Sequence, residues 1–339
     1  MRAVWWVLLV VMVVSLDARA QEPPPVVPVA SPPPFDEWLT ALRAEAIERG
    51  ISAELLDRAF AEIEPVEQII DRDRTQAEFT LALDDYLKRR LASPTVRIAR
   101  QMYAKHRKLL LRVEKEYGVP ARIVVAVWGL ESNFGRFSGV RPTIPALVTL
   151  AYDPRRSTMF RNELFSALEI VNRGDIELER LKGSWAGALG QPQFMPSSYL
   201  AYAQDFDDDG RKDIWSSQAD VFASIAFFLQ KHGWTPGRTW GREVRMSSIV
   251  QKAVLAIPRR EEGCRARRLM TDPRHIREWR KMGLQTMGRG RLPGADLAAS
   301  LVDAGRRTFL LYDNYEALLG YNCSHSYALS VGLLADRIR

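Results

Sequence analysis

The chain has 339 residues and carries 48 Lys and Arg against 41 Asp and Glu, so its formal net charge is +7, and its pI is near 9.5. A protein with this charge is expected to lie near polyanions, of which nucleic acid is the usual example. The export signal at the N-terminus argues against nucleic acid and favours an anionic polymer or lipid surface of the cell envelope.

The first 20 residues have the pattern of a cleaved signal peptide. Arg2 precedes an apolar stretch, residues 3–16, and Ala18-Arg19-Ala20 has the A-x-A form of a cleavage site. The stretch is shorter than the roughly 20 residues that a membrane span needs, and an uncleaved signal anchor is the alternative. No Cys stands at the cleavage site directly after this stretch, so we expect a secreted, periplasmic protein that is not a lipoprotein.

Residues 21–34, QEPPPVVPVASPPP, are expected to be a proline-rich linker, because proline at this density builds neither a helix nor a central strand. From about Phe35 the composition is that of an ordinary globular protein. The remaining chain of about 300 residues is long enough for two packed subdomains.

A helical subdomain is expected at residues 35–118. Its first helix is ended by Gly50, and Ser52 is the expected N-cap of the second. Apolar residues recur at the helical spacing in two further segments, 76–91 and 94–118.

The segment 119–235 is expected to form the core, and it opens with the apolar run PARIVVAVWGLE. The β-branched part of this run is compatible with a buried strand, but Pro120 at a first turn and the length favour a helix that Gly135 ends. Further helices are expected at 143–152, 158–173 and 217–231.

After Trp234 the sequence changes to short strand and turn patterns interrupted by proline. We therefore expect a small α+β subdomain at 236–315 and a C-terminal helix, within 316–339, that returns to the core. The predicted fold class is mainly α with an α+β part.

Two cysteines, Cys264 and Cys323, are present. In an oxidising compartment such a pair favours one disulfide, and two unpaired buried thiols are the alternative.

Glu131 stands at the end of the apolar run, in GLESNFG. A carboxyl in an apolar pocket has a raised pKa, stays protonated near neutral pH and can act as a general acid on a glycosidic oxygen. Generic glycosidases need a second carboxylate. Residues 132–152 hold no Asp or Glu, and Asp153 is better explained as a turn residue or ion pair, so the substrate itself has to complete the site. An N-acetyl group at C2 of a sugar can do so, as in substrate-assisted families.

The block 183–203, GSWAGALGQPQFMPSSYLAYA, combines glycines with aromatic, amide and hydroxyl side chains. Such a lining is typical of a sugar-binding groove. A packed turn between helices is an equally good interpretation of this block alone.

The loop DFDDDGRKD resembles a calcium loop, because Asp205, Asp207 and Asp209 fall at positions 1, 3 and 5 and Gly210 at position 6. Arg211 is placed to offer its carbonyl oxygen. The usual Glu at position 12 is replaced by Ser216, and we expect Asp220 to complete the shell instead. A metal-free acidic turn is the alternative.

ESNFG, the 183–203 block, DFDDDGRKDIW and the late YNCSHSYA segment occur in this order in B-type lytic murein transglycosylases, which the chain resembles from about Phe35 onward. The resemblance implies a lysozyme-like core and cleavage of the β-1,4 bond between N-acetylmuramic acid and N-acetylglucosamine in peptidoglycan. It implies a 1,6-anhydromuramic product, Glu131 as the single acid and base, a structural calcium ion, and no cofactor for catalysis.

Other site residues follow from the same resemblance. Ser184 and Gln193 match residues that bind sugar and orient the acid, and Tyr86 matches a tyrosine near the site. Arg155 and Arg156 match a basic pair suited to carboxylates of the substrate. The remaining matches, to an aromatic and amide wall, are Tyr321, Asn322 and Tyr327. The calcium ligands implied are Asp205, Asp207, Asp209, Arg211 and Asp220.

The expected partners are peptidoglycan glycan strands, with envelope-biosynthesis or divisome proteins as further candidates, and the chain is expected to be a monomer. Two alternatives to the transglycosylase stay open: a muramidase that uses water, and a peptidoglycan-binding scaffold without turnover.

Overall fold

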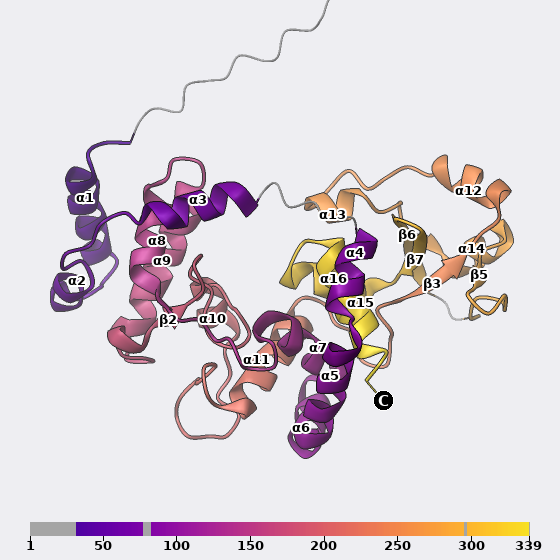
Figure 1. Cartoon of the computed structure of the whole chain (residues 1–339), viewed down its shortest axis with the longest axis horizontal. Coiled ribbons are helices and arrows are strands. Elements are labelled where there is room, and N and C mark those ends of the chain that lie inside the picture. Colours follow the sequence, from indigo (N-terminus) through magenta and orange to yellow (C-terminus); the bar gives the residue numbers. More distant parts are fainter. Residues whose placement is uncertain (1–31, 77–82, 295–296, 339) are drawn as a thin grey trace, which may run out of the picture. The chain divides into compact units, whose positions relative to one another are not determined.

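Helices form most of the chain in the computed structural model, which describes residues 32–76, 83–294 and 297–338 (Figure 1). The expected signal peptide at 1–20 and residues 21–31 of the expected linker lie outside the described residues, as does the 77–82 part of the helix expected at 76–91. None of the helices described is both long enough and apolar enough to cross a membrane.

The first ten helices belong to the regions expected to be the helical subdomain and the core. They are α1 (Phe35–Glu48), α2 (Ala53–Ala59), α3 (Glu67–Gln76), α4 (Leu83–Arg90), α5 (Ser93–Lys105), α6 (Arg107–Tyr117), α7 (Ala121–Ser132), α8 (Thr143–Tyr152), α9 (Ser157–Asn172) and α10 (Pro196–Tyr202).

The remaining helices begin with α11, which lies in the segment expected to be the core, and end near the end of the described chain. They are α11 (Gln218–Lys231), α12 (Ser248–Leu255), α13 (Arg265–Arg268), α14 (Ile276–Met282), α15 (Asp313–Tyr321) and α16 (His325–Ala335). The mainly helical class predicted from the sequence is confirmed.

The described residues also form two antiparallel sheets. The smaller pairs β1 (Arg141–Pro142) with β2 (Lys182–Gly183). The larger has the order β4-β6-β7-β3-β5. Its strands are β3 (Gly241–Arg245), β4 (Arg274–His275), β5 (Gln285–Thr286), β6 (Ala298–Ala304) and β7 (Arg307–Leu311).

Local signals set several helix ends as the sequence predicted. The Ser52 hydroxyl accepts a hydrogen bond from the Leu55 N–H at the start of α2, and Gly50 turns the chain after α1 with a φ of 87°. The segment expected to be helical over 94–118 is divided into α5 and α6 at His106. The His106 ring packs edge-on against Trp128 and Phe222, so packing between helices accompanies a break that the periodicity does not reveal.

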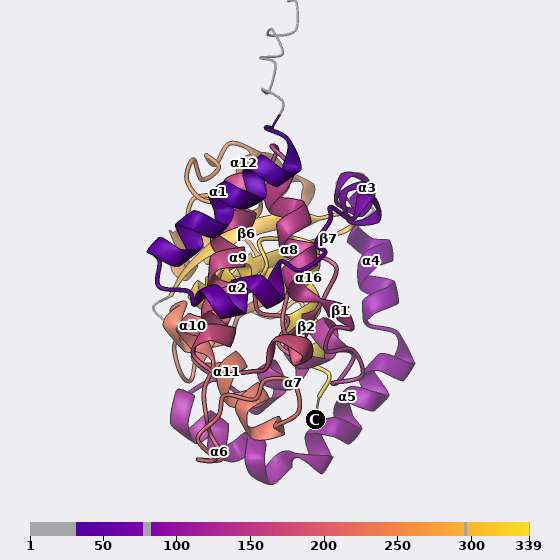
Figure 2. The ribbon, with the colours of Figure 1, turned by 90° about the vertical axis from the view of Figure 1, so that its left-hand side faces the viewer.

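The apolar run of residues 121–132 is the helix α7, and the alternative of a strand is wrong. Nine of its twelve residues are buried, because α7 packs against α5, α6, α11 and α16. Helices α8 and α9 pack side by side, as Figure 2 shows. Because α5, α6, α11 and α16 surround α7, little of the α7 surface is solvated, which explains why its sequence lacks an amphipathic pattern.

The sheet of β3–β7 has a small hydrophobic cluster of its own. Most of its members come from β3, α12, α14, β6 and β7, which lie together in Figure 1, and one of them, Trp279, is fully buried. This cluster lies wholly within the segment 236–315, for which the sequence predicted strands and one or two helices.

The C-terminal segment differs from the single helix expected within 316–339. α15 begins before it, at Asp313, and α16 follows after a break at 322–324. α16 packs against α7 and α4, so the end of the chain does return to the core.

Candidate active site

Glu131 lies in the last turn of α7, and the residues around it hold that turn in place. The Ser132 hydroxyl donates a hydrogen bond to the Trp128 carbonyl (3.0 Å) and accepts one from the Gly135 N–H (3.1 Å). The polar residue after Glu131 therefore closes the helix end, and its side chain is fully buried.

Three successive residues after the helix adopt positive φ, namely Asn133 (50°), Phe134 (60°) and Gly135 (78°). Positive φ is unfavourable for a side chain such as that of Phe134, and such conformations persist where the surroundings over-determine them. The Phe134 ring folds back onto Gly129, where a Cβ would come within 2.5 Å of the ring. The spacing in GLESNFG thus gives Phe134 a position against the helix that carries Glu131.

Glu131 is partly buried as a residue, and the Tyr327 hydroxyl and the Arg90 charge are the polar groups that act on its carboxyl. Burial raises its pKa to about 7, while the Tyr327 hydroxyl and the charge of Arg90 act in the opposite direction. The Tyr327 hydroxyl interacts with the carboxyl, and it has no hydrogen-bond partner of ordinary geometry among the described residues. Glu131 is therefore protonated in a large part of the molecules at neutral pH.

Two tyrosines from the C-terminal helices form one side of this environment. The rings of Tyr321, at the end of α15, and Tyr327, in α16, are stacked with centroids 6.1 Å apart. The Tyr321 hydroxyl donates to the Pro192 carbonyl (2.7 Å), which connects α15 to the block 183–203. Burial raises the pKa of both hydroxyls well above the ordinary value, with the Glu131 charge adding to the effect, so both stay protonated.

Helix α4 contributes Tyr86 and Arg90. The Arg90 Nε donates to the Tyr86 hydroxyl (3.3 Å), and the guanidinium lies over the Tyr86 ring, 5.4 Å from its centroid. Arg90 was not predicted as a site residue. Its spacing of four residues from Tyr86 is a signal that the sequence offers, but nothing in the sequence places α4 beside Glu131.

Ser184 and Gln193 both make contacts within their own loop. The Ser184 hydroxyl accepts from the N–H groups of Ala186 (3.3 Å) and Ala188 (3.1 Å). Gln193 has a φ of 55°, and its side-chain amide donates to the Gly190 carbonyl (2.7 Å). The structure thus shows these two side chains shaping the 183–203 block, and their contact with sugar remains a proposal.

Gln191 attaches the same block to α7. Its side-chain oxygen accepts from the Trp128 indole N–H (2.7 Å) and from Gln218 (3.2 Å), and its amide donates to the Trp215 carbonyl (2.8 Å). The residue is 4% exposed. Because each of these groups has a partner, Gln191 links the 183–203 block to other segments. The sequence did not reveal this role, because Gln191 stands among residues typical of a sugar-binding groove.

Arg155 and Arg156 form an ion-pair cluster with two carboxylates. Asp73 of α3 accepts from Arg155 (2.7 Å) and from Arg156 (3.0 Å), and Asp153 accepts from Arg155. Asp153 also accepts from the Arg155 backbone N–H (3.1 Å), so it is both a turn residue and an ion-pair residue, the two interpretations that the sequence left open. Both arginine side chains keep more than two fifths of their surface exposed. Asn322, which directly follows α15, is also exposed. The structure brings Glu131, Tyr86, Tyr321 and Tyr327 together, and it pairs the two arginines with carboxylates of Asp73 and Asp153.

The acidic loop brings three of its predicted ligands together. Carboxylate oxygens of Asp205, Asp207 and Asp209 lie within 4.8 Å of one another. One carboxylate oxygen of Asp205 is buried and has no hydrogen-bond partner in the part of the chain that the structure describes. A cation would satisfy this oxygen. The residues present therefore fit a hard divalent cation such as calcium.

The other two predicted ligands have different surroundings. Asp220 is fully buried and accepts from the backbone N–H groups of Phe206 and Asp213, at 2.8 Å each. Burial raises its pKa to about 6, against the effect of these two hydrogen bonds. The Arg211 N–H donates to Asp209. Asp220 thus holds the two ends of the loop together and lies outside the carboxylate cluster.

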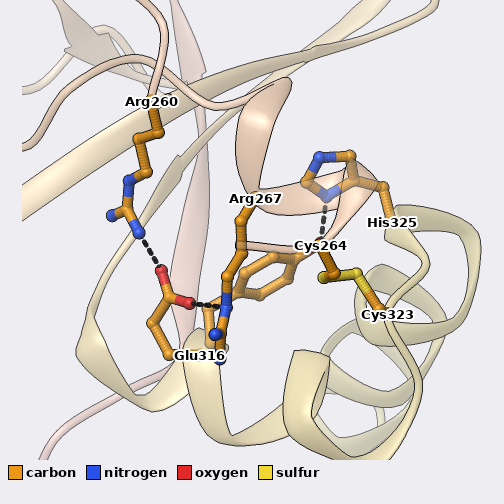
Figure 3. The surroundings of a disulfide bond; sticks show 7 residues. Arg260, Cys264, Arg267, Glu316, Cys323 and His325 are labelled. Carbon is orange, nitrogen blue, oxygen red and sulfur yellow. Dashed lines mark hydrogen bonds and ion pairs between the residues drawn. A yellow bond between two sulfur atoms is a disulfide. The ribbon is translucent and has the colours of Figure 1, made fainter. Parts of the chain in front are cut away.

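Cys264 and Cys323 form a disulfide with their Cα atoms 6.3 Å apart. It joins the start of α13 to the segment between α15 and α16, beside Glu316, which pairs with Arg260 and Arg267 (Figure 3). On the other side, the Tyr315 hydroxyl and the His325 Nδ1 share a hydrogen bond of 2.9 Å. The segment between Tyr321 and Tyr327 is thereby attached covalently to the α+β part.

Comparison with known proteins identifies the class to which this fold and site belong. A family model described as the transglycosylase SLT domain matches residues 34–336, and the chain belongs to this family. The membrane-bound lytic murein transglycosylase B of Escherichia coli strain K12 is 37% identical over 153 residues, which are 45% of this chain and 42% of that protein. The chain thus aligns with less than half the length of this curated relative.

Two solved structures resemble the chain over most of its length. SltB3 from Pseudomonas aeruginosa, solved in complex with NAG-anhNAM-pentapeptide, is 40% identical with a TM-score of 0.80, covering 90% of this chain and 79% of that one. The lytic transglycosylase Slt35 of Escherichia coli, solved in complex with calcium, is 26% identical with a TM-score of 0.74, covering 92% and 94%. These lysozyme-like structures confirm the predicted resemblance and the lysozyme-like fold class.

Proposed function

We propose that the chain is a lytic transglycosylase that cleaves the β-1,4 bond between N-acetylmuramic acid and N-acetylglucosamine in peptidoglycan and leaves 1,6-anhydromuramic ends. The observation that carries the proposal is Glu131, held at the end of a buried helix with its pKa raised to about 7, in a chain that belongs to the transglycosylase family. A single protonated carboxyl in apolar surroundings is suited to general acid catalysis at neutral pH.

In the first step Glu131 gives its proton to the oxygen of the glycosidic bond as that bond breaks. The positive charge that develops at C1 of the muramic sugar is stabilised by the N-acetyl group of the same sugar, as in substrate-assisted glycosidases. The groups that shift the Glu131 pKa are a tyrosine hydroxyl and an arginine, with no second carboxylate among them. Assistance by the substrate takes the place of that second carboxylate.

In the second step the Glu131 carboxylate removes the proton from the muramic C6 hydroxyl, whose oxygen then bonds to C1. The Tyr327 hydroxyl and the Arg90 charge both favour the carboxylate form that exists between the two steps. They therefore offset part of the cost of a buried negative charge. The acid is regenerated when the second proton is taken up.

The remaining predicted residues are proposed to bind the substrate. Tyr86, Tyr321 and Asn322 would contribute to a wall beside Glu131, and Ser184 and Gln193 would contact sugar from the 183–203 block. Arg155 and Arg156 keep exposed guanidinium surface, on which carboxylates of the substrate can bind.

We also propose that calcium binds Asp205, Asp207 and Asp209 and stabilises the loop, with backbone or water oxygens completing its shell. Slt35, which was solved with calcium, and the unpartnered Asp205 oxygen support this assignment. The ion would be structural, and no step of the proposed reaction passes through it.

The cellular context follows from the same proposal. Export by the segment 1–20 to the periplasm would place the enzyme at its substrate, glycan strands of peptidoglycan. Envelope-biosynthesis or divisome proteins are further candidate partners, and we propose that the chain acts as a monomer.

Digestion of purified sacculi with wild-type protein and with Glu131→Gln, followed by mass analysis of the products, tests the proposal. We expect anhydromuramic ends from the wild type and at least a thousandfold slower cleavage by the variant, which should still bind sacculi. Reducing muramic ends alone would favour the hydrolytic muramidase. If the wild type binds sacculi as well as the variant does but cleaves none, the peptidoglycan-binding scaffold would be favoured.

A further inference from the structure

A cationic hollow of about 470 Å³ lies in the α+β part of the chain, between α14 and the hairpin that follows it. Five of its lining residues are positively charged: Arg277, Arg280, Lys281, Arg289 and Arg291. None of its described lining residues is acidic. We call this feature the α14 hollow.

The cations of the α14 hollow lack the counter-charges that several other arginines of the described chain have. Arg260 pairs with Glu316, and Arg307 pairs with Glu243. In contrast, none of the five cations in the hollow forms an ion pair with any residue in the described ranges 32–76, 83–294 and 297–338. Four of the five are exposed and Arg280 is partly buried.

The backbone on both sides of the hollow is well anchored. On one side, α14 ends at Gly283, and the N–H of the buried Leu284 donates to the Trp279 carbonyl (3.1 Å). Trp279 is itself buried, and its indole N–H donates to the Ala299 carbonyl (2.9 Å). The helix that presents Arg277, Arg280 and Lys281 is thus fixed to the sheet.

On the other side, a tight hairpin presents Arg289 and Arg291. The Thr286 N–H donates to the Gly290 carbonyl (3.0 Å), and the Thr286 hydroxyl accepts from the Gly290 N–H (3.1 Å). Arg289 has a φ of 60°, and its N–H donates to the Thr286 carbonyl (2.9 Å). The backbone of Arg291 pairs with that of Gln285 in an isolated antiparallel β-bridge. The sequence therefore builds a turn that holds these two cations opposite α14.

Like charges that line one hollow repel one another, and a bound anion would relieve this repulsion. A guanidinium forms paired hydrogen bonds with carboxylate or phosphate oxygens. A phosphate presents more acceptor oxygens than a carboxylate does, so it can satisfy several guanidiniums at once. We propose that the α14 hollow binds the phosphate group of a ligand, which is either a lipid headgroup or a soluble phosphate compound.

This inference does not depend on the proposed catalytic function, since it concerns other residues. The test uses the full chain, with titration calorimetry against inorganic pyrophosphate at an ionic strength kept constant with sodium chloride. The variant is Arg280→Gln/Arg289→Gln. The matched control is Arg265→Gln/Arg268→Gln, two exposed arginines of α13 that do not line the hollow, so the net charge changes equally.

A second arm measures sedimentation with phosphatidylcholine vesicles that contain phosphatidylglycerol, against vesicles of phosphatidylcholine alone. We expect the hollow variant to bind at least tenfold more weakly than the wild type in one arm or both, and the control to bind like the wild type. Loss in the pyrophosphate arm indicates a soluble phosphate compound, and loss confined to the vesicle arm indicates a headgroup. Equal loss in hollow variant and control, or no effect of the hollow variant in either arm, would overturn the proposal. Circular dichroism and peptidoglycan cleavage, which should both be unchanged, verify that the variants are folded.

Discussion

At the scale of single residues, the pKa of Glu131 is set by opposing effects. Burial raises it to about 7, while the Tyr327 hydroxyl and the Arg90 charge lower it. Burial is therefore responsible for the raised pKa of Glu131, and the polar neighbours limit how far this pKa rises. A general acid is most effective when its pKa lies near the working pH.

We predict that Tyr327→Phe moves the alkaline limb of the pH profile upward. The acid must be protonated in the first step, so kcat/KM should fall as the pH rises through about 7 in the wild type. Removing the hydroxyl removes an effect that lowers the Glu131 pKa, so the midpoint should move to higher pH. The measurement is kcat/KM on a soluble muropeptide between about pH 5 and about pH 9, which covers both sides of the expected midpoint. Tyr199→Phe, in which the lost hydroxyl contacts the Lys212 carbonyl, is the control. A midpoint that stays in place or falls in Tyr327→Phe would contradict the assignment.

We predict that Glu131→Gln is more stable than the wild type at alkaline pH. The Glu131 pKa rises from 4.5 in the unfolded chain to about 7 in the fold, so between these values the native state holds a proton that the unfolded state has lost. Stability is therefore lost as the pH rises through this window, on the order of 3 kcal/mol when the shift is complete. Residual exposure of the residue makes the real value smaller.

Urea unfolding of both proteins near pH 8 and near pH 4.5 checks this second prediction, with the linear dependence on urea giving the two free energies. The advantage of the variant should be present at the higher pH and nearly absent at the lower one. An equal difference at both pH values would show that the carboxyl does not titrate in the fold as stated.

At the scale of elements, the segment between α15 and α16 is restrained by two kinds of contact. The disulfide attaches Cys323 to Cys264, and the ion pairs of Glu316 attach α15 to Arg260 and Arg267 (Figure 3). Tyr321 and Tyr327 lie on either side of Cys323. The restraint therefore acts on the two tyrosines that face Glu131.

We predict that Cys264→Ala/Cys323→Ala lowers the free energy of unfolding but leaves the fold intact. A link between residues 59 apart stabilises by about 4 kcal/mol in the chain-entropy description, and the Glu316 ion pairs still connect the same segments. Urea unfolding with and without a reductant provides the measurement. The reductant should destabilise the wild type and leave the double variant unaffected. A wild type that is insensitive to complete reduction would refute this role.

We predict that removal of calcium destabilises the acidic loop. Carboxylates of Asp205, Asp207 and Asp209 repel one another without a cation, and calcium at 100 times its dissociation constant would contribute about 2.7 kcal/mol. EDTA should lower the melting temperature of the wild type by several degrees and have no effect on Asp207→Ala. Asp208→Asn, at an exposed neighbour outside the cluster, should keep the response to EDTA. A wild-type melt that EDTA does not change would refute the calcium site.

At the scale of the whole molecule, the site is assembled from segments that are far apart in the sequence. Tyr86 comes from α4, Glu131 from α7, and Tyr321 and Tyr327 from α15 and α16. The contacts of α16 with both α7 and α4 bring these residues together. No local pattern specifies such contacts, and the prediction of these residues depended on their resemblance to a family.

The pairing of charges belongs to the same scale. Asp73 and Arg155 are 82 residues apart, yet they form a close ion pair. The family resemblance implied that the two arginines are a basic pair for the substrate, but the sequence could not identify their partner in the fold. Arg90 was missed for the same reason, because its effect on Glu131 depends on how α4 packs.

The sequence by itself determined the features that arise from neighbouring residues. The helical spacing predicted α8 and α11 closely, Ser52 predicted a helix start, and the acidic spacing predicted the cluster of Asp205, Asp207 and Asp209. The apolar run before Glu131 predicted its raised pKa. These features follow from propensity, capping and local burial, which act over a few residues.

Only the tertiary structure decided which distant groups meet. In the structure, the helix expected over 94–118 is divided at His106, and both carboxylate oxygens of Asp220 accept hydrogen bonds from the acidic loop. It also turned Gln193 toward its own loop and set Tyr327 and Arg90 against the acid. The physical reason is that these outcomes depend on packing and on electrostatic interaction between segments, and the energies involved are fixed only when the segments are in contact.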